Sequence, residues 1–308
     1  MKQTTPVKVL IGPSSFDANG CAALTRLKVE GYKIIENPFK RRLTKAEVIA
    51  LLSKDVIGLI AGLEPLDNEV LENSNLKVIS RCGSGLSNID LDAAKKLGIK
   101  VYSTPSSPVT AVAELTVGAI IGLLRMIPQI NNEMHAGKWT KLMGVQLEGK
   151  TIVIIGFGRI GSKVASLLEH FNARIVAVDP HIHGKDADGI EILPLDKALV
   201  LADIITIHCS GEEQIIGENE FKLIKQGAFL LNVARGNLVN EDALIRALDS
   251  GRIKGAYIDT FNVEPYSGRL IKYPQVILTP HIGSYTAECR MAMEMEAVEN
   301  LISGLKRG

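Results

Sequence analysis

Apolar and polar positions follow two rhythms along almost the whole chain. Short runs rich in β-branched residues, typical of buried strands, are separated by longer segments whose apolar residues recur every three or four positions, as in amphipathic helices. The first series of runs lies at 7–11, 33–35, 56–61, 76–80 and 100–103, and the second at 152–155, 174–178, 204–207, 228–233, 256–258 and 276–278. Apolar strands joined by helices indicate parallel sheets covered on both faces. The pattern therefore predicts an α/β protein with two doubly wound parallel sheets.

The two series also predict two domains. After residue 102 the segment "STPSSP", with two prolines, interrupts the pattern, and a long apolar helix is predicted over 111–127. The last segment, 284–308, has the spacing of an amphipathic helix, and we expect it to pack back on the first domain. The predicted boundaries are therefore 1–102 with 284–308 for one domain and 103–283 for the other. The capping box of Thr44 and Glu47 predicts the start of one helix.

Composition and charge exclude several classes of protein. Apolar residues make up 46% and charged residues 22% of the chain, which excludes a disordered protein. Lys and Arg number 35 against 34 Asp and Glu, so no overall field would attract nucleic acid or an anionic membrane. The only dense basic run, "FKRR" (39–42), is interpreted as a solvated loop. The start of the chain shows no secretory signal and no apolar run is long enough to span a bilayer, so we expect a cytoplasmic protein.

The cysteines predict no covalent or metal framework. Cys21, Cys82, Cys209 and Cys289 are scattered and form no C-x-x-C pair. This spacing fits neither a set of disulfides nor a zinc site, and no bound metal is expected.

A glycine-rich turn gives the strongest local signal. Gly156, Gly158 and Gly161 follow an apolar strand in the pattern G-x-G-x-x-G and precede a helix whose apolar face is predicted to hold Ile160, Val164, Leu167, Leu168 and Phe171. Such a turn brings the backbone close to a pyrophosphate and directs a helix N-terminus at it. Asp179 ends the next strand, where a carboxylate accepts hydrogen bonds from the adenosine ribose and repels a 2′-phosphate. The prediction is an NAD site rather than an NADP site.

Charged side chains follow three later strands at their carboxyl ends. Arg235 comes after 228–233, Asp259 and Glu264 come after 256–258, and His281 comes after 276–278. Each of them alone could be an ordinary surface or loop residue. Because the carboxyl ends of parallel strands share one edge with the glycine-rich turn, the set favours a functional site.

These motifs together resemble the D-isomer-specific 2-hydroxyacid dehydrogenases, and within them the short phosphoglycerate dehydrogenases. The resemblance covers nearly the whole chain and rests on "RCGSGLSNID", "AVAELTVGAIIGLLR", "GFGRIG", "NVARGNLVNEDAL", "IDTFNVEP" and "TPHIGS". It implies a Rossmann cofactor domain inserted in a flavodoxin-like substrate domain, and a chain without the carboxy-terminal regulatory domain, hence without feedback inhibition by serine through it. Ser87 and Ser210 depart from the family, which commonly has aspartate and proline there.

The resemblance also assigns roles to residues. His281 would be the general acid/base, Glu264 would fix its tautomer and favour the imidazolium, and Arg235 would hold the substrate carboxylate. Cofactor contacts are implied for the glycine-rich turn and for further positions around it. These are Ser84, Gly156, Gly158, Arg159, Ile160, Gly161, Asp179, Cys209, Val233, Ala234, Asp259, Gly283 and Ser284.

The substrate follows from the same resemblance. Gly83, Ser84 and Gly85 would present backbone N–H groups to the substrate carboxylate, and Arg81 would bind a phosphate, joined by Lys141 from a second subunit. The expected reaction is NAD-dependent oxidation of D-3-phosphoglycerate to 3-phosphohydroxypyruvate, in serine biosynthesis, by a homodimer built on 111–127. The loop at 60–65 lacks an arginine that some of these enzymes have. Alternatives are a glyoxylate/hydroxypyruvate reductase, another D-2-hydroxyacid dehydrogenase and, ranked lower, an NAD-sensing corepressor-like binding protein.

Overall fold

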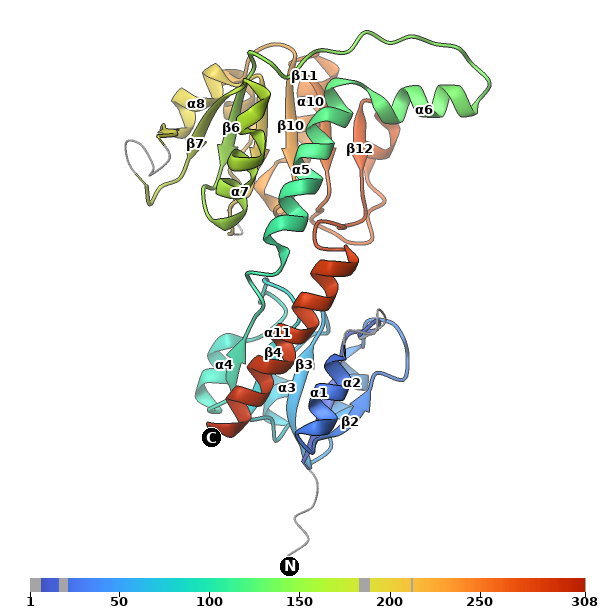
Figure 1. Cartoon of the computed structure of the whole chain (residues 1–308), viewed down its shortest axis with the longest axis vertical. Helices are drawn as coiled ribbons and strands as arrows, with labels where there is room; N and C mark the ends of the chain where they lie inside the picture. The colour runs from blue at the N-terminus through green and yellow to red at the C-terminus, as the bar shows by residue number, and fades with distance from the viewer. Residues whose placement is uncertain (1–6, 17–21, 183–188, 212, 308) are drawn as a thin grey trace, which may run out of the picture. The chain divides into compact units, whose positions relative to one another are not determined.

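The computed structural model describes residues 7–16, 22–182, 189–211 and 213–307. The chain divides into two compact units, one formed by Met1–Pro108 with Tyr285–Gly308 and the other by Val109–Ser284. In each unit a sheet is covered by helices (Figure 1).

The first unit contains a five-stranded parallel sheet in the order β2-β1-β3-β4-β5. Its strands are β1 (Lys8–Ile11), β2 (Lys33–Glu36), β3 (Val56–Ala61), β4 (Val78–Arg81) and β5 (Lys100–Tyr102). Because β2 lies on one side of β1 and the later strands lie on the other, the winding reverses between β1 and β3. In open α/β sheets the loops diverge at such a reversal and leave a crevice at the carboxyl ends of the strands.

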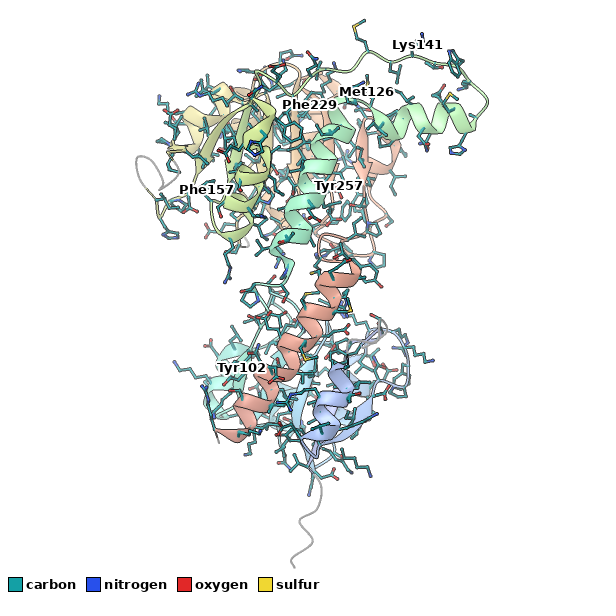
Figure 2. The ribbon with its side chains drawn as sticks, in the orientation of Figure 1. Tyr102, Met126, Lys141, Phe157, Phe229 and Tyr257 are labelled. Atoms are coloured by element: carbon teal, nitrogen blue, oxygen red, sulfur yellow. The ribbon has the colours of Figure 1, made fainter. Side chains whose placement is uncertain are left out.

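Helices cover both faces of this sheet. The helices α2 (Lys45–Leu51), α3 (Asn68–Glu72) and α4 (Leu91–Lys96) enclose one core with the strands. The helix α11 (Ala287–Lys306) contacts β3, β4 and β5 on the other face, beside α1 (Ala23–Val29). Gly304 permits this close approach, because a Cβ there would lie 2.8 Å from the ring of Tyr102, which Figure 2 shows beside α11.

The second unit contains a seven-stranded parallel sheet in the order β12-β11-β10-β9-β6-β7-β8. Its strands are β6 (Thr151–Ile155), β7 (Arg174–Val178), β8 (Glu191–Ile192), β9 (Ile204–Ile207), β10 (Ala228–Asn232), β11 (Ile253–Ile258) and β12 (Val276–Leu278). The winding reverses between β6 and β9. The carboxyl ends of these two strands are therefore the expected place for a nucleotide.

Successive residues of each strand in this sheet enter different cores. Ile152 and Ile154 of β6 lie in the core under α5 (Pro108–Leu124) and α7 (Arg159–Leu168). Val153 and Ile155 lie in the core of the opposite face, which α8 (Leu195–Leu201), α9 (Glu218–Leu223) and α10 (Glu241–Asp249) cover. Burial on both faces explains why the strand sequences are continuously apolar rather than alternating.

The predicted fold class is confirmed, and every strand predicted from the sequence is present. The capping box is confirmed as well, since Glu47 N donates to Thr44 Oγ1 (3.4 Å) and Thr44 N donates to Glu47 Oε2 (2.8 Å). The two-residue strand β8 was not predicted, because two residues are too short to show a period.

Two helix predictions were wrong in part. The helix predicted over 111–127 ends at Leu124, Met126 adopts a left-handed φ of 52°, and α6 (Ile127–His135) follows. Pro128 lacks the N–H that would continue the ladder of α5. Phe171 does not lie on the buried face of α7, since that helix ends at Leu168 and Phe171 is 38% exposed in the 3₁₀ turn η1 (Glu169–Phe171).

Within the described residues no single helix has the length and apolarity needed to cross a membrane. The bent pair of α5 and α6 meets those criteria of length and composition only when the two helices are taken together.

Candidate active site

Arg235, Glu264 and His281 all lie at the carboxyl edge of the seven-stranded sheet, after β10, β11 and β12. His281 Nδ1 lies 3.1 Å from Glu264 Oε2, within hydrogen-bond distance. The other carboxylate oxygen, Oε1, accepts from the backbone N–H of Phe261 (3.1 Å). Since an ionised carboxylate only accepts, Nδ1 carries the proton in this pair and Nε2 is left for another partner. The His281 side chain is 45% exposed, so its ring is open to solvent.

A buried carboxylate holds the loop that carries His281. Asp259, which is fully buried, accepts hydrogen bonds from Thr279 Oγ1 (2.5 Å), Ile282 N (2.8 Å) and Gly283 N (2.9 Å). His281 between them has a left-handed φ of 53°, which is uncommon for a residue with a side chain. The hydrogen bonds to Asp259 on both sides of His281 stabilise this conformation.

The loop of Arg235 is fixed by its neighbours in a similar way. Asn232 Nδ2 donates to Arg235 O (2.8 Å), and Arg235 Nη1 donates to Ala234 O (2.7 Å). Gly236 has no side chain where the next loop passes, and a Cβ there would clash with the backbone of Phe261. The absence of a Cβ therefore lets the Arg235 loop pack against the loop that leads to Glu264.

The glycine-rich turn has the shape that a bound dinucleotide requires. Gly156 has a φ of 90° and packs against the backbone of Cys209, so a side chain fits neither its conformation nor its space. A Cβ at Gly161 would clash with the carbonyl oxygen of Gly156, which shows how closely α7 approaches the turn. Gly158, the N-cap of α7, has no atom near its Cβ position and is exposed. The space in front of this helix N-terminus is therefore open to an anion.

The carboxylate of Asp179 lies beside this turn at the end of β7. It accepts from Phe157 N (3.0 Å) and from His181 N (2.9 Å), which ties the turn to the end of that strand. Cys209, after β9, is half-buried, and burial raises the pKa of its thiol. These positions fit the predicted adenosine side of an NAD site, since they follow β6, β7 and β9 at the reversal of the winding.

The structure also reveals a residue that the sequence analysis missed. His208 follows β9, next to Cys209, and its Nε2 lies 2.8 Å from Thr206 Oγ1, while its Nδ1 is buried without a partner in the described part of the chain. Burial lowers the pKa of His208 to about 3, so the ring is neutral. A histidine that directly continues an apolar strand was the available signal.

The other predicted cofactor positions differ in exposure. Arg159 is exposed and Ile160 half-buried at the start of α7, whereas Val233 and Ala234 are buried after β10. Gly283 is buried and Ser284 half-buried after His281. Asp259 was predicted as a cofactor contact, but in the structure three groups of the His281 loop occupy its carboxylate, so positioning that loop is the role its contacts support.

The predicted substrate contacts near "GSG" lie in the first unit, at the carboxyl end of β4. Gly83 has a φ of 143°, its N–H donates to Thr104 Oγ1 (2.8 Å), and its carbonyl accepts from Thr104 N (3.0 Å). Ser84 is exposed, Gly85 is half-buried, and Arg81 donates to the carbonyl of Cys82.

Within the second unit, Lys141 lies apart from Arg235, Glu264 and His281, which are called the triad below. Figure 2 shows it on the long connection that runs from α6 to β6. That connection enters the amino end of β6, whereas the triad lies at the carboxyl edge of the same parallel sheet. The structure therefore does not bring Lys141 to the triad, and its contact with a partner's substrate stays a prediction.

No group of three His, Cys, Asp or Glu side chains in the described part of the chain is placed to hold a metal ion. Cys82, Cys209 and Cys289 are free thiols, and Cys21 lies outside the described residues.

Comparison with known proteins identifies the family. Residues 117–283 match the model of the D-isomer specific 2-hydroxyacid dehydrogenase, NAD binding domain. The chain belongs to the D-isomer-specific 2-hydroxyacid dehydrogenases. The family match confirms the resemblance seen in the sequence and assigns to the second unit the NAD-binding domain of these dehydrogenases.

Relatives and solved structures extend this likeness to both units. D-3-phosphoglycerate dehydrogenase of Homo sapiens is 37% identical over 286 residues, which cover 90% of this chain and 53% of the human protein. A structure from Thermus thermophilus superposes with a TM-score of 0.89 at 31% identity, over 98% of this chain and 97% of the other. A glyoxylate reductase from Paecilomyes thermophila gives 0.87 at 28% identity, over 99% and 97%. The chain spans about half the length of the curated relatives it matches.

Proposed function

We propose that the chain is an NAD-dependent dehydrogenase that oxidises D-3-phosphoglycerate to 3-phosphohydroxypyruvate, the chemistry of serine biosynthesis. The observation that carries the proposal is the hydrogen-bonded pair of Glu264 and His281, with Arg235 after the neighbouring strand β10, on the edge of an NAD-binding domain. The phosphorylated substrate is supported by relatives whose name is D-3-phosphoglycerate dehydrogenase.

The proposed mechanism assigns one task to each side chain. Arg235 binds the substrate carboxylate through its planar fork of N–H donors. His281 removes the hydroxyl proton through Nε2, because Nδ1 is engaged with Glu264. When bound, NAD⁺ would accept the hydride from the substrate carbon that carries the hydroxyl group. The C–H and O–H bonds break, a carbonyl forms, and the proton remains on the imidazole beside Glu264.

A second candidate function rests on the solved structures. The likeness to a glyoxylate reductase at 28% identity favours reduction of an unphosphorylated keto acid by the same residues. A panel of 2-hydroxy and 2-keto acids, with and without phosphate and followed by NADH absorbance, decides between the two. We expect the highest kcat/KM with D-3-phosphoglycerate. A higher value with glyoxylate or hydroxypyruvate would move the assignment to the reductases, and NADH binding without any turnover would favour a corepressor-like protein.

A homodimer belongs to the same proposal. Large apolar side chains are exposed on α6 and the connection after it: Ile127 (52%), Met134 (47%), Trp139 (80%), Leu142 (40%) and Met143 (91%). A cavity of about 320 Å³ lies nearby, between the end of α5 and η1, lined by Ile121, Leu124 and Phe171 among others. Exposed apolar clusters of this kind mark interfaces. Analytical sedimentation of the unmutated protein should show a dimer. A double variant with Trp139→Ser and Met143→Ser should dissociate into monomers at higher protein concentration.

A cytoplasmic location completes the proposal. It is supported by the three free thiols of the described residues, which suit a reducing compartment.

A further inference from the structure

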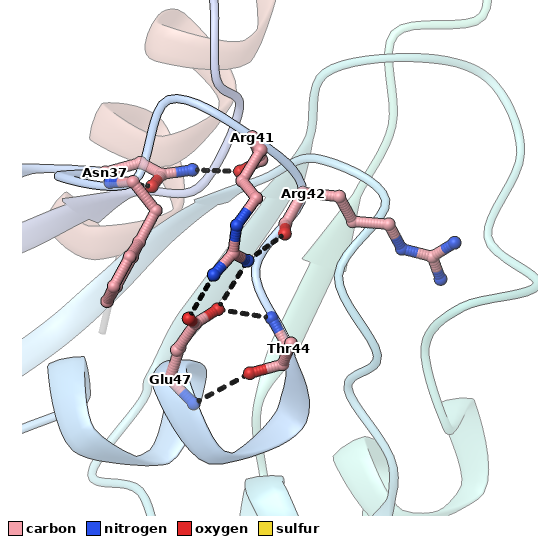
Figure 3. A network of polar contacts seen from close by, with 6 residues as sticks. Asn37, Arg41, Arg42, Thr44 and Glu47 are labelled. Atoms are coloured by element: carbon pink, nitrogen blue, oxygen red, sulfur yellow. Dashed lines mark hydrogen bonds and ion pairs between the residues drawn. The ribbon is translucent and has the colours of Figure 1, made fainter.

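The basic run "FKRR", interpreted from the sequence as a solvated loop, divides into two kinds of arginine in the structure. Arg41 is fully engaged: its guanidinium donates to both carboxylate oxygens of Glu47 (2.6 and 2.9 Å) and to the carbonyl of Arg42 (3.0 Å). It also lies over the ring of Phe39. The Arg42 guanidinium is exposed, and no partner for it is found among the described residues. In Figure 3 its side chain extends away from the pair of Arg41 and Glu47.

The backbone of Arg42 is nevertheless held in place. Its carbonyl accepts from Arg41, and the next residue, Leu43, is only 1% exposed and belongs to the core under α2, α3 and α4. A fixed backbone with an unpaired, exposed guanidinium suits a group that binds a ligand, since little backbone order remains to be gained on binding.

The loop of Arg42 is linked to the loop after β1, at the reversal of the winding in the five-stranded sheet. Asn37 Nδ2 donates to Gly12 O (2.8 Å), the residue after β1, and to Arg41 O (2.8 Å). The carboxylate of Glu64, from the loop after β3, lies against Gly12 and accepts from Gly62 N (2.9 Å). Loops that follow β2, β1 and β3 are thereby linked at one carboxyl edge.

Arg81 reaches the same place from β4. Glu64 is 1% exposed, burial raises the pKa of its carboxyl group, and the charges of Arg81 and Arg42 oppose that shift. Arg81 pairs in register with Ala61, the last residue of β3 and three residues before Glu64, so Arg81 and Glu64 come from neighbouring strand ends. Asn88 Nδ2 closes the arrangement by donating to the carbonyl of Glu64 (2.7 Å). Two cations around one buried anion leave a net positive site at the edge where the "GSG" segment lies.

We propose that Arg42 is a specificity-determining residue that, together with Arg81, binds the anionic group at the far end of the substrate. The inference rests on the proposed function, since it takes that group to be the phosphate of D-3-phosphoglycerate. Arg42 would supply the second cation, which the loop at 60–65 lacks. Glu64 is the buried counter-charge of this cluster.

The test compares two variants that remove the same charge from the same loop. Arg42→Gln removes the proposed contact, and Lys40→Gln is its matched control, because Lys40 is exposed and has no hydrogen-bond partner in the described part of the chain. Loss of a charge-assisted hydrogen bond predicts a rise of about tenfold or more in KM for D-3-phosphoglycerate with Arg42→Gln. We expect kcat to stay unchanged, Arg42→Lys to restore part of the affinity, and Lys40→Gln to match the unmutated protein. The KM for D-glycerate should change less than twofold in all three.

Binding measured without turnover separates this inference from the proposed function. Calorimetric titration with D-3-phosphoglycerate should show the same loss of affinity in Arg42→Gln alone. If the unmutated protein binds this acid through Arg42 but does not oxidise it, the proposed function fails and the role of Arg42 stands. Equal affinities for Arg42→Gln and Lys40→Gln, or no binding by the unmutated protein, would overturn the role of Arg42.

Discussion

The two sheets end in edges that are organised differently. On the seven-stranded sheet, Arg235 and His281 lie three residues and Glu264 six residues after their strands, and a buried carboxylate holds one of these loops, since Asp259 accepts from both sides of His281. On the five-stranded sheet, the polar cluster is assembled from loops after β1, β2, β3 and β4, around a carboxylate that is 1% exposed.

The difference has a physical meaning for the two halves of the proposed reaction. Chemistry requires atoms placed to within a fraction of an ångström, which rigid strand ends provide. Recognition of a substrate's far end tolerates more variation, and the loops of several strands can each supply a cation. The predictions that follow test whether the first edge carries the chemistry and the second edge the selectivity.

The largest effect is expected from His281→Ala. Loss of the general acid/base should lower kcat by about 10²–10⁴-fold while NADH binding, measured by fluorescence, stays near normal. His170→Ala, on the exposed turn η1, is the matched control and should leave both quantities unchanged. A variant lacking His281 that keeps nearly full kcat would place the chemistry elsewhere.

The glycine-rich turn offers two substitutions with opposite signatures. Gly161→Ala introduces a Cβ that clashes with the carbonyl oxygen of Gly156, so overpacking of about 1–3 kcal/mol should appear as a lower melting temperature. Gly158→Ala meets no protein atom, so the melting temperature should hold while NADH binds about tenfold or more weakly. Equal NADH affinity in Gly158→Ala and the unmutated protein would show that the cofactor does not bind at the N-terminus of α7.

Asp259→Asn tests how far the strand end depends on a buried residue. One amide oxygen cannot replace two carboxylate oxygens, and the amide N–H₂ would face the N–H of Gly283 or Ile282. A loss of about 1–3 kcal/mol in the free energy of unfolding is expected, with a lower kcat, because the loop of His281 loses its anchor. Denaturant unfolding measures this loss, and Asp196→Asn, at an exposed position of α8, should show neither effect. Wild-type kcat in Asp259→Asn would show that the loop is held by other contacts.

The common position of Arg235, Glu264 and His281 at one edge of the sheet could be predicted from the sequence because each of them follows an apolar strand. The contacts that hold them could not be predicted. Asp259 was given a cofactor role, and only the structure shows its carboxylate occupied by the His281 loop. Asn232 and His208 were missed although both stand at the end of an apolar strand, because that position does not show which partner a polar side chain will meet. The cluster around Glu64 joins residues from four loops, and no sequence period connects such positions.

A smaller effect is expected on the choice of cofactor. Removing the negative charge at residue 179 should lower the ratio of kcat/KM for NAD to that for NADP, because a carboxylate there repels a 2′-phosphate. Asp179→Ala also loses the hydrogen bonds from Phe157 and His181, whereas Asp179→Asn keeps one acceptor. If both variants shift the ratio alike, charge repulsion is the cause; a shift in Asp179→Ala alone would point to the shape of the turn.

The smallest effect concerns the counter-charge of the second edge. Burial raises the pKa of Glu64 above its ordinary value of 4.5, so the folded protein binds this proton more tightly than the unfolded chain does. The resulting stabilisation is complete below about pH 4.5 and is lost as pH rises through the folded pKa.

The variant Glu64→Gln keeps an acceptor for Gly62 N but has no proton to lose, so its stability lacks this dependence on pH. The melting temperature of Glu64→Gln should therefore rise relative to that of the unmutated protein as pH rises from 4.5 to 8. Glu36→Gln, an exposed carboxylate at the end of β2, should show no such gain. A constant difference between Glu64→Gln and the unmutated protein at every pH would mean that Glu64 ionises in the folded protein as it does in the unfolded chain, and the two arginines would then fully compensate its burial.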